Sequence, residues 1–297
     1  MALIDGLLSP GSTFQKRFFF LAKRFVAGES IDVALDAIRQ VNEQGMSATL
    51  DFLGEDVCEA REALRTREVY LEMLDRIRDA GVNTNVSVKL TALGLLAAES
   101  MASDNLAAIL ARAQRNPDPF VRIDMEGSAV TQATLRVFEQ LYADYRNVGP
   151  VLQAYLKRTP ADVERAITLG ARVRLCKGAY NEPLQIAYQD MPTIRRQYSR
   201  MAERLLLAKH YPGIATHDRI LVEAVKRFTQ RNDVSKDAFE FQLLYGVRPE
   251  MQRDLVSQGY RVRVYIPFGT HWATYFYRRV TERRENALFA LRSMFGK

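Results

Sequence analysis

From residue 47 onward the sequence alternates between strand-like and helix-like runs, and this alternation limits the possible folds. Eight short runs have strand character, at 47–54, 83–90, 119–126, 150–156, 171–178, 213–218, 238–246 and 260–269. Between them, apolar residues follow helical spacing at 61–81, 131–145, 159–170, 192–211, 218–230 and 248–259. Such alternation predicts a parallel sheet covered by helices, and eight units in roughly 250 residues favour a closed (β/α)₈ barrel. No GxGxxG turn follows any strand, which disfavours a dinucleotide-binding open sheet.

We expect one domain over residues 1–297, with an N-terminal helical arm at 1–45 and the barrel at 46–297. No Pro-, Gly- or Ser-rich linker divides the chain. Two helical segments are predicted in the arm, at 11–27 and 29–44. The first combines a run of phenylalanines with lysines and arginines, so it either docks on the protein's own core or contacts a membrane surface.

The composition excludes several classes of protein. Hydrophobic residues make up 47% of the 297 and charged residues 26%, as in a soluble domain with a large core. The net charge of +7 is compatible with nucleic acid, an anionic membrane or a phosphate-bearing ligand, but the basic residues are dispersed among acids, as on a solvated surface. Two distant cysteines and three histidines without ligand spacing predict neither a disulfide framework nor a metal site. No membrane-spanning run and no secretory signal are recognised.

The predicted strands end in polar residues. In a (β/α)₈ barrel, catalytic groups gather at the carboxyl ends of the strands. Each polar end alone is explained by contact with water, but all eight together favour a lined pocket. The residues concerned are Asp51, Glu55, Lys89, Asp124, Glu126, Gln153, Arg174, Lys177, Thr216, His217, Asp218, Glu240, Gln242 and Tyr265.

Two of the predicted strands carry polar residues with period two. Charges inside a barrel wall are costly unless they are paired or bound to a ligand. We therefore expect these side chains to face inward, toward a polar and charged ligand. They are Arg122, Asp124 and Glu126 in one strand and Arg172, Arg174 and Cys176 in the other.

An arginine pair follows the eighth strand in a long helical segment. Arg278 and Arg279 are adjacent, and Glu282 lies four residues after Arg278. Two guanidinium groups bind a carboxylate through paired hydrogen bonds, and a nearby acid keeps them oriented. A solvated basic helix face explains the same spacing, but the position after the last strand favours a place over the barrel mouth.

Several segments together resemble the proline dehydrogenase family, whose members are flavoenzymes. They are 174–180 (RLCKGAY), 215–218 (ATHD), 240–246 (EFQLLYG), 263–269 (RVYIPFG) and 275–283 (YFYRRVTER). The resemblance runs from residues 50–55 to the arginine pair in the order of the family. Since no aldehyde dehydrogenase module is present, the chain resembles the monofunctional form. The resemblance implies a distorted (β/α)₈ barrel that holds FAD non-covalently at the carboxyl ends of the strands, with the C-terminal helix over the mouth.

The resemblance also implies the residues that bind the substrate. Arg278 and Arg279 would bind the carboxylate of L-proline, with Lys89 as a third positive charge. The remaining residues on this side would be Glu282 supporting the pair, Glu55 pairing with Arg278, Tyr265 and Leu244 on the pyrrolidine ring, and Tyr180 near the flavin.

On the cofactor side, the resemblance implies that Arg174 lies beside the reactive flavin nitrogen, with Asp124 orienting it. Arg174, Asp124 and Tyr265 would form the catalytic group. The other cofactor-binding residues would be Gln153 at the flavin, Lys177 at the pyrophosphate together with Gly178 and Ala179, and Thr216 and His217 at the nucleotide.

The activity implied is the oxidation of L-proline to Δ1-pyrroline-5-carboxylate, by hydride transfer from C5 of the ring to N5 of FAD. Electrons would pass to a membrane quinone, in the first step of proline catabolism to glutamate. We expect a cytoplasmic enzyme, peripheral at the inner face of the cell membrane, without a metal and without a nucleic-acid partner.

Three alternatives remain at this point. A hydroxyproline dehydrogenase shares fold and cofactor, although the bulky Tyr265 would crowd an added hydroxyl group. A flavin-free barrel enzyme would bind a phosphorylated substrate through Arg174, Lys177 and Thr216. A non-catalytic basic protein would bind a polyanion and would leave the inward-facing charges unexplained.

Overall fold

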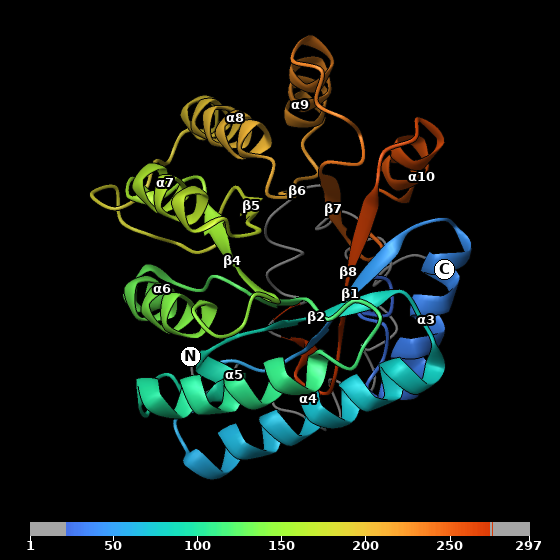
Figure 1. Ribbon diagram of the computed structural model, residues 1–297, viewed down its shortest axis with the longest axis vertical. Coiled ribbons are helices and arrows are strands. Elements are labelled where there is room, and N and C mark those ends of the chain that lie inside the picture. The colour runs from blue at the N-terminus through green and yellow to red at the C-terminus, as the bar shows by residue number, and fades with distance from the viewer. Residues whose placement is uncertain (1–21, 274, 276–297) are drawn as a thin grey trace, which may run out of the picture.

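A computed structural model describes residues 22–273 and 275 and shows a closed parallel barrel (Figure 1). The strands pair in sequence order, and the last pairs with the first. The eight predicted strands are confirmed, and most are shorter than expected because their polar ends belong to loops. They are β1 (Ser47–Phe52), β2 (Thr84–Val88), β3 (Val121–Ile123), β4 (Val148–Gln153), β5 (Arg174–Cys176), β6 (Gly213–Ala215), β7 (Glu240–Leu244) and β8 (Val262–Phe268).

Helices surround the barrel and cover its outer face (Figure 1). They are α3 (Ile31–Glu43), α4 (Ala60–Ala80), α5 (Glu99–Ala113), α6 (Ser128–Tyr142), α7 (Thr159–Leu169), α8 (Met191–Ala208), α9 (Arg219–Arg231) and α10 (Pro249–Ser257), with a short 3₁₀ helix η1 (Thr91–Leu93). The sequence analysis did not predict α5. Its buried face includes Ser103 and Asn105 among small alanines, so the apolar periodicity is weak.

Helix ends follow the local signals of the sequence. Gly81 and Gly170 end α4 and α7 in the left-handed conformation, with φ of 62° and 75°. The side chains of Asp190 and Asp218 accept backbone N–H groups at the starts of α8 and α9. These caps fix where each helix meets its neighbouring loop, and the loop before α9 carries predicted site residues.

The barrel wall has an apolar outer face and a polar inner face. In β5, Leu175 and the preceding Val173 are fully buried against the helices, whereas Arg174 between them belongs to the barrel interior. This explains the alternation in residues 171–178: the outer residues form the core, and the inner residues form a charged interior. Glu240, Gln242 and other buried polar residues continue this interior on the remaining strands.

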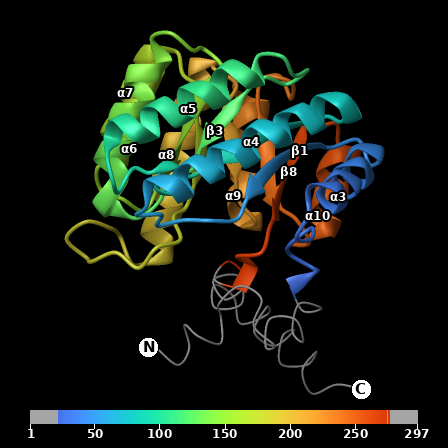
Figure 2. The same ribbon diagram turned by 90° about the horizontal axis from the view of Figure 1, so that it is seen from below.

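The carboxyl ends of the strands face one end of the barrel, which we call the mouth. Figure 2 shows the loop after β5 projecting at the end where β8 finishes. Residues 22–28 also lie there: the N–H of Ala27 donates to Pro267 O, and Phe25 packs with Leu53 and Trp272. The rest of the predicted 11–27 segment lies outside the described residues, and the division into an arm and a barrel stays a prediction.

Candidate active site

Arg174 lies at the centre of the polar mouth and is 6% exposed. Its Nη1 donates to Asp124 Oδ1 at 2.7 Å and to Ser87 Oγ at 3.1 Å. Its Nε donates to Gln242 Oε1, and its guanidinium carbon lies 5.2 Å from the centre of the Tyr265 ring. Groups from four other strands or strand ends therefore fix the direction of one guanidinium group.

Asp124, directly after β3, is the anion that holds Arg174. Besides the guanidinium it accepts the hydroxyl of Ser87 at 3.0 Å and the phenol of Tyr265 at 2.7 Å. Burial, together with the charge of Asp124, raises the pKa of Tyr265 well above its ordinary value, so its phenol stays protonated. The structure thus brings together Arg174, Asp124 and Tyr265, the three residues predicted as the catalytic group.

Lys89 has a partner that the sequence analysis gave no role. Its Nζ lies 3.0 Å from Oδ2 of Asp51, and both residues are buried. Burial alone would lower the pKa of Lys89, but the charges of Asp51 and Asp124 and the hydrogen bond to Asp51 together outweigh it. The net shift is upward, so Lys89 stays an ammonium. Tyr70 donates to Asp51 Oδ1 at 3.5 Å. Asp51 was noted as a polar strand end, and its place on a neighbouring strand was the signal for this pair.

The predicted nucleotide-side residues after β5 and β6 meet around Asp218. Its Oδ2 lies 3.4 Å from Lys177 Nζ and accepts Arg195 Nε at 2.8 Å. The N–H of Asp218 donates to Thr216 Oγ1 at 3.1 Å. The Nε2 of His217 accepts the backbone N–H of Leu244 at 2.9 Å. Asp218 was noted only as a polar strand end and Arg195 was not predicted, yet both orient this cluster.

Gln153 ends β4 on the same side of the mouth. Its side-chain Nε2 donates to the backbone oxygen of Glu126 at 3.0 Å, and its backbone carbonyl accepts the hydroxyl of Thr159. Glu126 accepts the hydroxyl of Thr91 at 2.5 Å and its N–H at 3.2 Å. Burial raises the pKa of Glu126 to about 7, with the hydrogen bonds from Thr91 opposing the shift. A second carboxyl group at the rim therefore titrates near neutral pH.

The loop after β5 closes over this side of the mouth. Gly178 has φ of +116°, and a Cβ atom there would lie 2.2 Å from the ring of Tyr155, so a side chain is excluded. Ala179 is exposed and Tyr180 half-buried. Farther along, the carboxylate of Glu182 accepts the N–H of Ser128 at 2.6 Å and its hydroxyl at 2.5 Å, at the start of α6. This contact ties the loop after β5 to the start of α6.

Leu244 and Glu55 were predicted on the substrate side, and both lie within the described residues. Leu244 is half-buried beside the cluster of Phe25 and Trp272, whereas Leu243 lies in the outer core, so Leu244 is the residue presented at the mouth. Glu55 is half-buried in the loop after β1. Arg278, Arg279 and Glu282 lie outside the described residues, and their roles stay predictions.

Two inward arginines do not serve the mouth, which corrects the expectation that both polar strand faces address a ligand. The guanidinium of Arg172 lies 4.1 Å from the ring centre of Phe120 and 4.7 Å from that of Tyr211. Arg122 donates to Arg172 O at 2.9 Å and also stacks on Phe120, at 4.6 Å. Both precede the mouth residues of their strands by two positions and find partners within the protein.

Cys176 also has a protein partner. Its Sγ donates to Leu152 O at 3.6 Å, and burial raises its pKa to about 12. The side chain is therefore a thiol at neutral pH and does not supply a thiolate. Among residues 22–273 and 275, no group of three or more His, Cys, Asp or Glu side chains is arranged to hold a metal ion.

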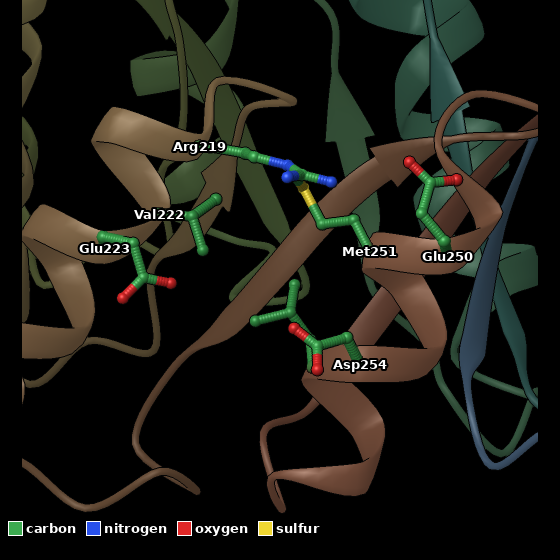
Figure 3. Close-up of a pocket in the computed structure, with 7 residues that line it drawn as sticks. Arg219, Val222, Glu223, Glu250, Met251 and Asp254 are labelled. Atoms are coloured by element: carbon green, nitrogen blue, oxygen red, sulfur yellow. The ribbon is translucent and has the colours of Figure 1, made fainter.

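A groove of about 490 Å³ lies outside the barrel wall, between α9 and α10. Figure 3 shows Arg219 of α9 and Met251 of α10 pointing toward one another across it. Glu223, Glu250 and Asp254 give the groove an acidic rim. None of the predicted site residues lines it, so the candidate active site is the mouth.

Comparison with known proteins decides the family. The family model described as "Proline dehydrogenase" matches residues 34–292. The chain belongs to the proline dehydrogenase family. Proline dehydrogenase 1 of Bacillus subtilis (strain 168) is 37% identical over 276 residues, which cover 93% of this chain and 91% of that protein. Proline dehydrogenase of Deinococcus radiodurans is 36% identical, over 94% and 92%. The proline dehydrogenase family expected from the sequence is confirmed.

A solved structure of another protein shares the fold. Proline utilization A (PutA) from Bdellovibrio bacteriovorus, inactivated by N-propargylglycine, matches with a TM-score of 0.84 and 27% identity. That match covers 95% of this chain and 34% of the PutA chain, so the present chain spans about a third of that protein. The distorted TIM-type barrel expected from the sequence is confirmed. The described residues include no helix with the length and hydropathy of a membrane span.

Proposed function

We propose that this member of the proline dehydrogenase family uses FAD to oxidise L-proline to Δ1-pyrroline-5-carboxylate, the first step from proline toward glutamate. A membrane quinone is the proposed electron acceptor. The observation that carries the proposal is Arg174, a buried guanidinium group held by Asp124, Ser87 and Gln242 at the mouth of the barrel. A cation fixed before any ligand arrives stabilises negative charge without reorganisation.

The donors at the ends of β4, β5 and β6 fit FAD. They combine a fixed guanidinium, a more exposed ammonium, and neutral amide, hydroxyl and imidazole groups, which suits a planar heterocycle joined to an anionic diphosphate. Gly178 adds a backbone turn without a side chain of its own, packed against the ring of Tyr155. The residues that would hold the group are Gln153, Arg174, Lys177, Gly178, Ala179, Thr216 and His217. When bound there, FAD would supply the two-electron acceptor for the hydride that leaves C5 of proline.

The chain's own residues bind and orient the substrate. Arg278 and Arg279 are proposed to hold the carboxylate, supported by Glu282 and Glu55. Lys89 adds a positive charge, which its ion pair with Asp51 stabilises. Leu244 and the ring of Tyr265 would flank the pyrrolidine ring, and Tyr180 would border the site from the loop after β5. Holding both partners in one geometry is the main contribution a protein makes to such a reaction.

Tyr265 also bears on the choice of substrate. Its phenol is tied to Asp124 at 2.7 Å, so the ring cannot swing away to admit an added hydroxyl group. We therefore propose proline rather than hydroxyproline as the preferred substrate.

Peripheral membrane contact is proposed as the route to the quinone. In the basic segment 11–27 it would use residues 11–21, because Ala22, Phe25 and Val26 are buried in the protein. Sedimentation with anionic liposomes before and after deletion of residues 1–21 tests it.

The decisive experiment is an absorbance spectrum of the purified protein, followed by anaerobic addition of L-proline and then of a short-chain quinone. We expect flavin bands that bleach with proline and return with quinone. Hydroxyproline at the same concentration should bleach them more slowly.

Each other outcome removes one part of the proposal. A colourless protein that gains no bands on incubation with FAD would exclude the cofactor. Bands that bleach with proline but do not return with quinone would exclude the acceptor. Faster bleaching with hydroxyproline would overturn the substrate preference.

A further inference from the structure

Arg174 is held from inside the barrel as well as from the mouth. Its Nε donates to Oε1 of Gln242, a β7 residue that is 4% exposed. This contact adds to the bonds from Nη1 to Asp124 and Ser87. The guanidinium therefore has acceptors on two edges, and Gln242 supplies the one on the inner side.

The direction of the Gln242 amide is set by its neighbours on both sides. Its Nε2 donates to Oε1 of Glu240 at 2.6 Å, while its Oε1 accepts from Arg174. The reversed amide would turn its NH₂ group toward a guanidinium N–H and its oxygen toward a carboxylate, and both contacts would be repulsive. Glu240 thus selects the amide orientation that Arg174 needs.

Glu240 is itself anchored. It accepts Arg263 Nε at 2.8 Å and the hydroxyl of Tyr211 at 3.3 Å. Arg263 in turn donates to Ala48 O at 2.7 Å and pairs with Asp118 at 3.1 Å. The Arg263 and Glu240 side chains are only 6% and 3% exposed. The backbone of β1 and side chains near the amino ends of the strands hold this pair. The carboxylate that orients Gln242 is therefore itself fixed in place.

Gly213 of β6 provides the room for the amide. The strand register pairs it with Arg174 on one side and with Glu240 on the other. A Cβ atom at residue 213 would lie 2.4 Å from Nε2 of Gln242 and 2.7 Å from its Cδ. The amide of Gln242 thus occupies the space that a side chain at 213 would take.

We infer that Gln242, seated on Gly213 and oriented by the Glu240–Arg263 pair, is a positioning residue that sets the direction of the Arg174 guanidinium. Its effect on proline turnover rests on the proposed function, whereas its effect on Arg174 does not. Gln242 touches no reacting atom in this scheme and acts through Arg174.

Two variants remove the contact in different ways. Gln242→Met keeps an unbranched side chain of similar length but leaves Nε of Arg174 without this acceptor. Gly213→Ala keeps the glutamine and pushes its amide aside. Asn116→Ala is the matched control, because it deletes another buried amide, one that donates to Leu74 O and has no contact with Arg174.

The primary readout is the ¹H–¹⁵N signal of the Arg174 Nε–H group in the protein as purified, assigned by its loss in Arg174→Lys. We expect both test variants to shift this signal and to speed its exchange with water, and Asn116→Ala to leave it unchanged. With proline as substrate, we expect kcat to fall roughly ten- to hundredfold, as for loss of a hydrogen bond to a charged group, with KM nearly constant.

An unchanged Nε–H signal in Gln242→Met and Gly213→Ala would overturn the inference, whatever the activity. A shifted signal with unchanged kcat would overturn the link to turnover. If the unmodified protein does not oxidise proline, the proposed function fails, and the Nε–H signal still decides whether Gln242 positions Arg174. Adding Gln242→Met to Arg174→Lys should lower kcat no further, because the glutamine acts through the arginine.

Discussion

The barrel interior contains two charged regions that look alike in sequence and differ in purpose. The mouth layer comprises Asp51, Lys89, Asp124 and Arg174, and the base layer comprises Asp118, Arg122, Glu240 and Arg263. In the base layer each bond we describe ends on another protein group: Arg263 joins Glu240, Asp118 and a backbone carbonyl. In the mouth layer the ion pairs lie where the strands end and the loops begin, beside the face open to a ligand.

The difference shows that a buried charge in a barrel wall does not by itself indicate a ligand. Arg122 and Arg174 both face inward and are both nearly inaccessible. Their positions along the strands separate them, because carboxyl ends of strands form the site in this fold and amino ends stabilise it. Loss of a cation should therefore lower mainly the stability in the base layer and mainly the activity in the mouth layer.

The largest effect on stability is expected in the base layer. Arg263→Met leaves Glu240 and Asp118 without their shared cation, and removing one member of a buried pair typically costs about 3–5 kcal/mol. We expect the free energy of unfolding in urea to fall by that amount. Arg261→Met is the control on the same segment, since its pair with Asp237 is 52% and 72% exposed and should contribute less than about 1 kcal/mol. Equal losses in the two variants would contradict the structural role of the base layer.

Loss of the mouth cation should reverse the pattern. In Arg174→Met, Asp124 keeps the hydroxyl groups of Ser87 and Tyr265 as donors, so we expect a loss of only about 1–2 kcal/mol in unfolding free energy. Turnover of proline should fall about 10²–10³-fold, the usual cost of removing a preorganised electrostatic group. Steady-state kinetics and urea unfolding on the same preparations measure both quantities. A variant that loses stability as Arg263→Met does would erase the distinction between the layers.

The sequence predicted the fold well because barrel strands and most helices leave strong local signals. Helix α5 escaped notice since Ser103 and Asn105 lie on its buried face, where hydrogen bonds such as that from Asn105 to Leu93 O replace apolar contacts. Period-two alternation also placed Arg174 and Asp124 on inner faces. These features depend on residues close together in the chain.

The partners inside the barrel were harder to predict. Alternation says which residues face inward but not which of them meet, and Lys89 pairs with Asp51, 38 residues earlier. The alternation also does not show how far along the barrel axis a residue lies, so Arg122 and Arg172 were wrongly assigned to the ligand. Both properties depend on how the strands are staggered when the barrel closes, and no local pattern in the chain encodes that stagger.

Two buried glutamates extend the comparison to pH. At the base, burial would raise the pKa of Glu240, but Arg263 and Arg122 outweigh it and the pKa is lowered. At the rim of the mouth, burial raises the pKa of Glu126 from 4.5 to about 7; Thr91 and Lys89 oppose the shift and Glu55 adds to it. Glu126 therefore binds its proton more tightly in the folded than in the unfolded chain, and the stability it contributes is present below pH 4.5 and lost as the pH rises through about 7.

A pH-dependent change in stability follows from this sign. Glu126→Gln mimics the protonated carboxyl group, so its unfolding free energy relative to the unmodified protein should rise by about 2–3 kcal/mol between pH 5 and pH 8. Glu240→Gln should be less stable than the unmodified protein by a constant amount over the same range, because Glu240 is ionised throughout. If the Glu126→Gln difference is also constant, the hydrogen bonds from Thr91 keep that carboxyl group ionised. The glutamates of the mouth and the base would then both be ionised over this pH range. The two layers would differ only in whether a ligand can reach them.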